Sequence, residues 1–150
     1  MAGSYEVLRR AVLYIMNFHK FTVEVFAELR MSRKRGRYSM KTDTIAAIAT
    51  AMTSSGIGIV RISGDEAVSI TDRIFEMKNQ KKLEDMPTHT IHYGHIHDGD
   101  EVIDEVMVLL MRGPKSYTRE DTVEIDCHGG VYVMKRILET VIKYGARPAE

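Results

Sequence analysis

The segment from Thr122 to His128 constrains the fold more than any other part of this chain of 150 residues, because its side chains alternate strictly. One set is apolar and would point toward a core: Val123, Ile125 and Cys127. The other set is ionisable and would point away from it: Glu124, Asp126 and His128. Gly129 and Gly130 then open a predicted helix, whose buried face would be Met134, Ile137, Leu138 and Val141. Gly145 is predicted to end that helix. A strand that leads into a helix in this way is typical of α/β architecture.

The rest of the chain after residue 40 predicts short strands and one more helix. The strands are Thr44 to Ala49, Ile57 to Ser63, Thr90 to His97 and Val102 to Met111, the last two joined by a turn at Asp98 and Gly99. The helix would begin at a capping-box pair, Ser63 and Glu66, and bury Ala67, Ile70, Thr71, Ile74 and Phe75. The order of elements favours an α/β (α+β) fold, a mixed sheet with helices packed on it.

The formal net charge of zero conceals two different parts of the chain. Residues 1–39 contain eight Lys and Arg against three Asp and Glu, whereas residues 40–150 contain thirteen against eighteen. The basic run from Arg30 to Arg37 is typical either of a nucleic-acid or anionic-membrane patch, or of a solvated tail. A third interpretation is that the residues before Met40 translate a ribosome-binding site, so that Met40 is the native start. We expect residues 1–39 to be an extension and residues 40–150 to be the domain.

The single cysteine, Cys127, excludes an internal disulfide framework and favours a reducing compartment. The apolar run from Ala11 to Met16 is too short to span a bilayer, and no clean signal-peptide cleavage site follows it. The sequence therefore predicts a cytoplasmic location without membrane attachment.

The ionisable face of residues 122–128 is the first candidate site. It lies at the carboxyl end of a predicted strand, before a glycine-rich turn and a helix N-terminus, where α/β proteins often bind ligands. An exposed strand face with ordinary polar residues would give the same pattern. Cys127 and His128 do not form a nucleophile–base pair, because adjacent strand residues face opposite sides.

Two further patterns point to binding. His89, His92, His95 and His97 suggest a metal site, but a strand brings only two of them to one face, so zinc is not favoured and no metal is expected. Arg61 lies in an apolar strand and needs an anionic partner, which could be a ligand or an acidic side chain.

Four motifs in order resemble one known family. They are Gly56 to Gly64 (GIGIVRISG), Thr90 to Gly94 (TIHYG), Ser116 to Glu124 (SYTREDTVE) and Cys127 to Gly130 (CHGG). Together they resemble the N-terminal domain of the bacterial tRNA modification GTPases known as MnmE or TrmE, over about Thr42 to Glu150. No catalytic residue of the family maps onto this chain.

The resemblance implies a homodimerising module that binds a tetrahydrofolate, in particular 5-formyltetrahydrofolate, with Arg61 and Glu124 as the ligand contacts. Glu124 would meet the pterin, whose two adjacent donors suit a carboxylate, and Arg61 would meet another polar part of the ligand. The fold is expected to be similar to the folate-binding part of the glycine-cleavage aminomethyltransferases. Full-length relatives add helical and GTPase domains, and act with a flavin-dependent partner on the wobble uridine of tRNA.

This sequence departs from the family pattern at three places. Thr53 and Ser55 stand in a loop that is usually richer in proline and glycine, and Arg119 stands where the family has glycine, so a positive φ there would be strained. The phosphate-binding loop of a GTPase is absent from these 150 residues, so we expect a truncated, non-catalytic module.

Two other functions remain open at the level of sequence. A stand-alone folate-dependent aminomethyltransferase-like enzyme would use Asp126 or His128 as its acid or base. A nucleic-acid-binding protein would use the basic run from Arg30 to Arg37.

Overall fold

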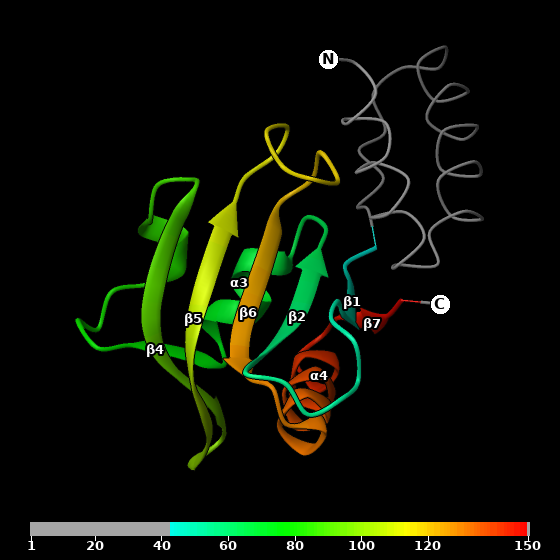
Figure 1. The fold of residues 1–150 in the computed structure, drawn as a ribbon. Helices are drawn as coiled ribbons and strands as arrows, with labels where there is room; N and C mark the ends of the chain where they lie inside the picture. Colours follow the sequence, from blue (N-terminus) through cyan, green and yellow to red (C-terminus); the bar gives the residue numbers. More distant parts are fainter. Residues whose placement is uncertain (1–42, 150) are drawn as a thin grey trace. The chain divides into compact units, whose positions relative to one another are not determined.

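The computed structural model describes residues 43–149, which belong to one compact unit, Lys41–Ala149. Their framework is a single seven-stranded sheet in the order β3-β4-β5-β6-β2-β1-β7 (Figure 1). The strands are β1 (Ile45–Ile48), β2 (Ile57–Ser63), β3 (Phe75–Met77), β4 (Thr90–Asp98), β5 (Glu101–Met111), β6 (Thr122–His128) and β7 (Arg147–Pro148). Neighbouring strands are antiparallel except β1 and β7, which are parallel. The predicted mixed sheet is thus confirmed, while its similarity to the aminomethyltransferases stays a prediction.

Two α-helices, α3 (Ala67–Asp72) and α4 (Val131–Lys143), contribute to one hydrophobic core with the sheet (Figure 1). Three of the four predicted core residues of α4 are fully buried: Met134, Ile137 and Val141. Leu138 is only partly buried against that core. The helix ends as predicted, because Gly145 follows it with φ +125°, a value that costs glycine little.

The alternation in β6 separates the two faces of the sheet. Val123 and Ile125 are completely buried and Cys127 nearly so, and all three belong to the same core as the helices. Their intervening neighbours lie on the opposite face. Within residues 43–149, that face is formed by strands and carries no helix, and we call it the open face (Figure 1). The sequence prediction for this strand is confirmed.

The predicted capping box is wrong. Glu66 is the N-cap residue of α3, but no side chain caps the helix there. The Ser63 hydroxyl instead lies 2.7 Å from Thr118 Oγ1 and 3.2 Å from Glu120 Oε2, since the loop before β6 offers it polar partners. The helix is also shorter than predicted, because Phe75 belongs to β3 and pairs with Ile96 of β4.

Two short strands, β3 and β7, were not predicted, because neither is long enough to show a period. The polar segment 78–87 between β3 and β4 contains a 3₁₀ turn, Leu83–Asp85, in which Leu83 is fully buried. The Asp72 carboxylate accepts hydrogen bonds from the Leu83 and Glu84 N–H groups at 2.5 and 2.9 Å. A helix-end side chain therefore holds this turn against the core.

The predicted hairpin between β4 and β5 is confirmed, with Gly99 at φ +63° in its turn. No helix among residues 43–149 has the length and hydropathy needed to cross a membrane. The predicted extension, residues 1–39, with its basic run and the proposed start at Met40, lies outside the described residues.

Candidate functional site

Arg61 and Glu124, the two residues implied as ligand contacts, are direct cross-strand neighbours on the open face. Arg61 of β2 is in register with Glu124 of β6. The Arg61 Nε donates a hydrogen bond to Glu124 Oε1 at 2.6 Å, and Nη2 forms an ion pair with the same oxygen. Glu124 is only 7% exposed, so its charge needs this cation. The expectation that Arg61 requires an anionic partner is met by an acidic side chain.

The loop between β5 and β6 covers this ion pair from one side. The Tyr117 ring lies with its centroid 5.1 Å from the Arg61 guanidinium carbon, a cation–π distance. Tyr117 itself is largely exposed. The sequence showed this tyrosine only as part of a motif, because no local pattern ties a loop residue to a strand 56 positions earlier. The loop thus presents an aromatic surface next to the paired charges.

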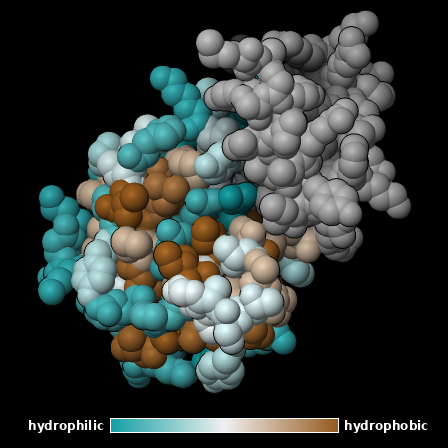
Figure 2. Space-filling model, viewed as in Figure 1, coloured by the Kyte–Doolittle hydropathy of each residue, from teal (hydrophilic) through white to brown (hydrophobic). Residues whose placement is uncertain are grey.

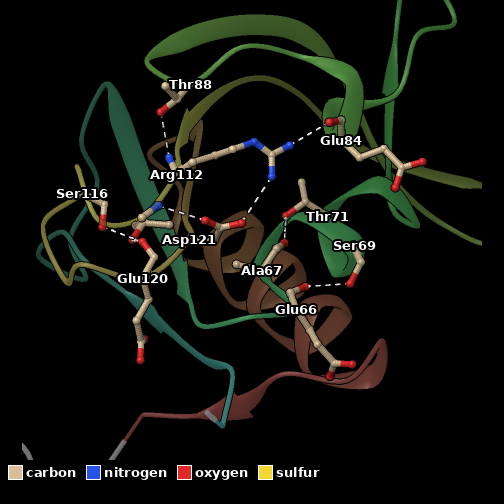
Figure 3. A network of polar contacts seen from close by, with 12 residues as sticks. Glu66, Ala67, Ser69, Thr71, Glu84, Thr88, Arg112, Ser116, Glu120 and Asp121 are labelled. Atoms are coloured by element: carbon tan, nitrogen blue, oxygen red, sulfur yellow. Dashed lines mark hydrogen bonds and ion pairs between the residues drawn. The ribbon is translucent and has the colours of Figure 1, made fainter. Parts of the chain in front are cut away.

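Arg112 and Asp121 anchor the two ends of that loop (Figure 3). The Asp121 carboxylate accepts hydrogen bonds from the Gly113 N–H at 2.9 Å and from Arg112 Nη1 at 3.3 Å. Arg112 Nη2 donates to the Glu84 carbonyl at 2.8 Å, and the Arg112 N–H donates to Thr88 Oγ1 at 2.8 Å. These contacts fix the loop to the sheet and the 3₁₀ turn, so the position of Tyr117 does not depend on the loop alone.

Arg119 has φ +69°, which confirms the strain expected where the family has glycine. We expect Arg119→Gly to raise the free energy of unfolding by about 0.5 to 1 kcal/mol, since relief of the left-handed conformation outweighs the added freedom of the unfolded chain. Arg119→Ala keeps the unfavourable φ and should give no gain. Urea denaturation of the three proteins measures both effects, and equal stabilisation by alanine and glycine would contradict the explanation.

The loop with the other departures, residues 51–56, is exposed and lies beside the Cys-His-Gly-Gly turn. The Ser55 N–H donates a hydrogen bond to the Gly129 carbonyl at 3.1 Å. A Cβ added to Gly129 would stand 2.2 Å from the Ser55 carbonyl oxygen, so the close approach requires glycine at this position. Ser55 therefore contacts the turn through its backbone, and it is Gly129 that must lack a side chain.

Asp126 lies on the open face, two residues beyond Glu124 in β6. Burial raises the pKa of its carboxyl, and the negative charge of Glu124 raises it further. Its Oδ1 is closed to solvent and receives no hydrogen bond from the described residues. The structure therefore brings Asp126 next to the ion pair, as the alternation of β6 predicted.

His128, at the end of β6, is oriented by Asp104 of β5. The Asp104 carboxylate accepts a hydrogen bond from the His128 N–H at 2.9 Å, and its Oδ1 lies 2.7 Å from His128 Nδ1. The imidazole is largely exposed, at 69% of its side chain. Asp104 was missed by sequence reasoning, although it interrupts the apolar pattern of its strand. The pair lies at the strand end, two residues beyond Asp126.

Cys127 faces the core, away from these groups. Burial, with a smaller contribution from the charge of Asp104, raises the pKa of its thiol to about 11. The Sγ donates to the Gly58 carbonyl at 3.3 Å. A thiol with this pKa is a poor nucleophile near neutral pH, which agrees with the exclusion of a Cys–His pair.

The histidines of β4 do not converge with the Arg61 and Glu124 pair. His95 and His97, with Glu76 of β3, line a separate cavity of about 350 Å³ near the outer edge of the sheet. His97 Nε2 lies 3.4 Å from Glu76 Oε2. Across residues 43–149, no three His, Cys, Asp or Glu side chains are grouped so that they could hold a metal ion.

Apolar side chains continue the open face from the ion pair toward β4. Ile91, Leu109, Glu124 and Arg61 form one cross-strand row, and Tyr93, Met107, Asp126 and Ile59 form the next. Ile91 is 65% exposed, and Tyr93 and Met107 are each 46% exposed. Figure 2 shows apolar surface over β4 and β5 on this face. We call Ile91, Tyr93 and Met107 the apolar strip. An exposed apolar group next to buried charges is typical of a binding surface.

The family model and the individual relatives that match this chain point to the same family. The family described as GTP-binding protein TrmE N-terminus matches residues 44–150. A protein of Lachnoclostridium phytofermentans named tRNA modification GTPase MnmE is 61% identical over 112 residues, which are 74% of this chain and 24% of that protein. The protein of the same name from Geobacillus thermodenitrificans is 56% identical over 110 residues, 72% of this chain and 24% of the relative.

A third relative with that name, from Thermoanaerobacter pseudethanolicus, is 54% identical over 113 residues, 74% of this chain and 25% of the relative. The chain thus spans about a quarter of the length of the curated relatives it matches. The match begins at Thr44, where β1 of the sheet is about to start, and it includes the Arg61 and Glu124 pair. By this match, the chain belongs to the TrmE N-terminal family.

Proposed function

We propose that this chain is a tetrahydrofolate-binding module, with 5-formyltetrahydrofolate as its ligand, and that the Arg61 and Glu124 pair holds the ligand. The single observation that supports this most is the pair itself. A nearly buried carboxylate is hydrogen-bonded and ion-paired to an arginine on a sheet face that no described helix covers. Its position beside exposed apolar side chains suits a ligand that is flat, partly apolar and polar along one edge.

The geometry of the pair suits recognition of an amino-pyrimidine edge. The Arg61 Nε and Nη2 contacts with Glu124 both reach Oε1, and neither reaches Oε2. A carboxylate fixed in this way accepts hydrogen bonds from adjacent ring N–H and amino donors, which the pterin presents. Arg61, with Tyr117 over its guanidinium, would meet another polar group of the ligand, for which the folate tail offers carboxylates.

We also propose the role of the module in a larger protein. Its relatives are named tRNA modification GTPases, and we infer from that name that the module serves tRNA modification. The family resemblance implies the finer proposal, in which the modified base is the wobble uridine, the location is the cytoplasm and the partner is a flavin-dependent protein. The folded unit contributes the folate site and a homodimer contact. The apolar strip supports the dimer, because exposed apolar surface of this kind is typical of protein interfaces.

Isothermal titration with 5-formyltetrahydrofolate tests the proposal. Glu124→Gln removes the charged acceptor and should weaken binding about 100-fold, which corresponds to about 2.7 kcal/mol. Arg61→Lys keeps the charge but not the planar fork, and should weaken binding about tenfold. The matched control is Glu139→Gln, an exposed carboxylate on α4, which should bind as the wild type does.

Two results would contradict the proposal. Unchanged affinity in both Glu124→Gln and Arg61→Lys would place the ligand elsewhere, provided that circular dichroism shows both variants folded. Sedimentation of the same wild-type samples gives the mass of the particle, and a monomer with and without ligand would rule out the homodimer.

A further inference from the structure

Of the two acidic side chains of β6, Glu124 is paired with Arg61, whereas Asp126 takes no part in that ion pair. It stands between Ile59 of β2 and Met107 of β5, so both direct cross-strand neighbours are apolar. Its Oδ1 is shut off from solvent without a hydrogen-bond donor among residues 43–149. A buried acceptor left in this state is costly, and a folded protein retains it where the group has another use.

The neighbouring carboxylates are satisfied in a way that Asp126 is not. Glu124 has Arg61, and Asp104 has both the main-chain N–H and the ring of His128. Arg61 lies on the adjacent strand β2, and His128 lies at the end of β6. The cross-strand row of Asp126 instead contains the exposed Tyr93 and Met107, neither of which is charged. The unsatisfied oxygen is thus placed beside the apolar strip, next to the carboxylate that the proposed ligand would meet.

The charges around Asp126 favour its neutral form. Burial raises its pKa, and Glu124 on the same face adds to the rise. The other ionisable groups near it are His128 on its own strand, Arg61 on β2, and Asp104 and Glu105 on β5. Arg61 is engaged with Glu124, so its charge is directed at the neighbouring carboxylate. A carboxyl that holds its proton becomes a hydrogen-bond donor.

We propose that Asp126 is a further ligand contact of the Arg61 and Glu124 site, and that its neutral carboxyl donates a hydrogen bond to an acceptor on the ligand. This inference rests on the proposed function. An amino-pyrimidinone edge carries a carbonyl oxygen beside its N–H and amino groups. An ionised Glu124 suits the donors of such an edge, and a protonated Asp126 suits the acceptor. Together they distinguish this edge from one that presents donors alone.

The dependence of affinity on pH separates this role from a purely structural one. The ligand would favour protonated Asp126, so wild-type affinity for 5-formyltetrahydrofolate should fall about tenfold as pH rises from the ordinary range of an aspartate through the raised pKa of Asp126. Asp126→Asn keeps the shape and a donor but cannot ionise, and it should show a flat profile within about threefold of the wild-type affinity at low pH. Asp126→Ala removes the donor and should bind about tenfold more weakly at low pH.

The comparison between variants isolates Asp126. Every other titrating group of the chain and of the ligand is common to all three proteins. Glu124 is the one group whose titration the substitutions also change, because its charge interacts with that of Asp126. Parallel pH profiles for the wild type and Asp126→Asn, or unchanged low-pH binding by Asp126→Ala, would overturn the inference and leave the folate site intact. If the wild type gives no binding at any pH, the proposed function fails, and the role of Asp126 fails with it.

Discussion

Arg61→Met is expected to lower the free energy of unfolding by about 3 kcal/mol, whereas the double variant Arg61→Met, Glu124→Leu should regain most of that loss. The single change leaves the Glu124 carboxylate nearly buried without its cation, which is the costly state. The double change replaces both ions by apolar groups of similar size, and the two side chains continue the apolar row of Ile91 and Leu109. The pair would then be required by the ligand and not by the fold.

Urea denaturation at neutral pH measures these differences, with Lys82→Met as the matched control. Lys82 and Glu84 form an ion pair whose side chains are 69% and 54% exposed, so its loss should cost less than about 0.5 kcal/mol. A double variant as unstable as Arg61→Met alone would mean that the fold itself needs these charges. A loss no larger than that of the control would mean that water already screens the pair.

Gly94→Ala is expected to destabilise the sheet by about 3 kcal/mol, near the upper end for overpacking. A Cβ at this position would stand 2.2 Å from the Glu76 carbonyl oxygen and 2.7 Å from a ring carbon of Phe75. Both atoms belong to β3, whose register with β4 sets Met77 opposite Gly94. The clash is with the backbone, so a side-chain rotation does not relieve it. The alanine would separate β3 from β4 and expose Phe75 and Met77, which are buried.

Thermal unfolding of Gly94→Ala and Gly56→Ala tests this effect. A Cβ at Gly56 meets nothing within 4 Å, so this control should be neutral or slightly stabilised through its less flexible unfolded chain. Hydrogen exchange in the first protein should be fastest at Met77 and its neighbours. If Gly94→Ala unfolds at the same temperature as the control, β3 can move away from the added methyl group without a loss of stability, and the prediction is wrong.

The long strands could be predicted from sequence, since their period is set by residues a few positions apart. β2 was predicted with the bounds that it has, and the alternation predicted over residues 122–128 coincides with β6, in which it separates the core from the open face. β3 and β7 have three and two residues, too few to show a period, and they exist through pairing with distant strands. The capping box failed for a related reason, because Ser63 found its partners 55 and 57 positions away.

The residues of the candidate site could be predicted in part, whereas the contacts between them could not. Arg61 and Glu124 could each be singled out, one as a charge in an apolar strand and the other by alternation and resemblance. Their contact required the register of β2 with β6, which no local pattern contains. Tyr117 and Asp104 lay beyond prediction because each acts through contact with one residue of a strand that is distant in sequence.

The pairing of β7 with β1 brings the last strand of the described unit beside the first, so the same fold could be built from a chain whose elements are joined in a different order. The Arg147 N–H donates to the Thr44 carbonyl at 2.8 Å, and the Ala149 N–H donates to the Ala46 carbonyl at 2.9 Å. Residue 149 therefore lies beside residue 46. Because β1 and β7 are parallel, a linker from residue 149 to residue 44 would run back along β1 in a circular permutant with new ends at Gly99, where a Cβ would meet open space. Neither β2 nor β6 would be cut, so the rearranged chain would retain the Arg61 and Glu124 pair.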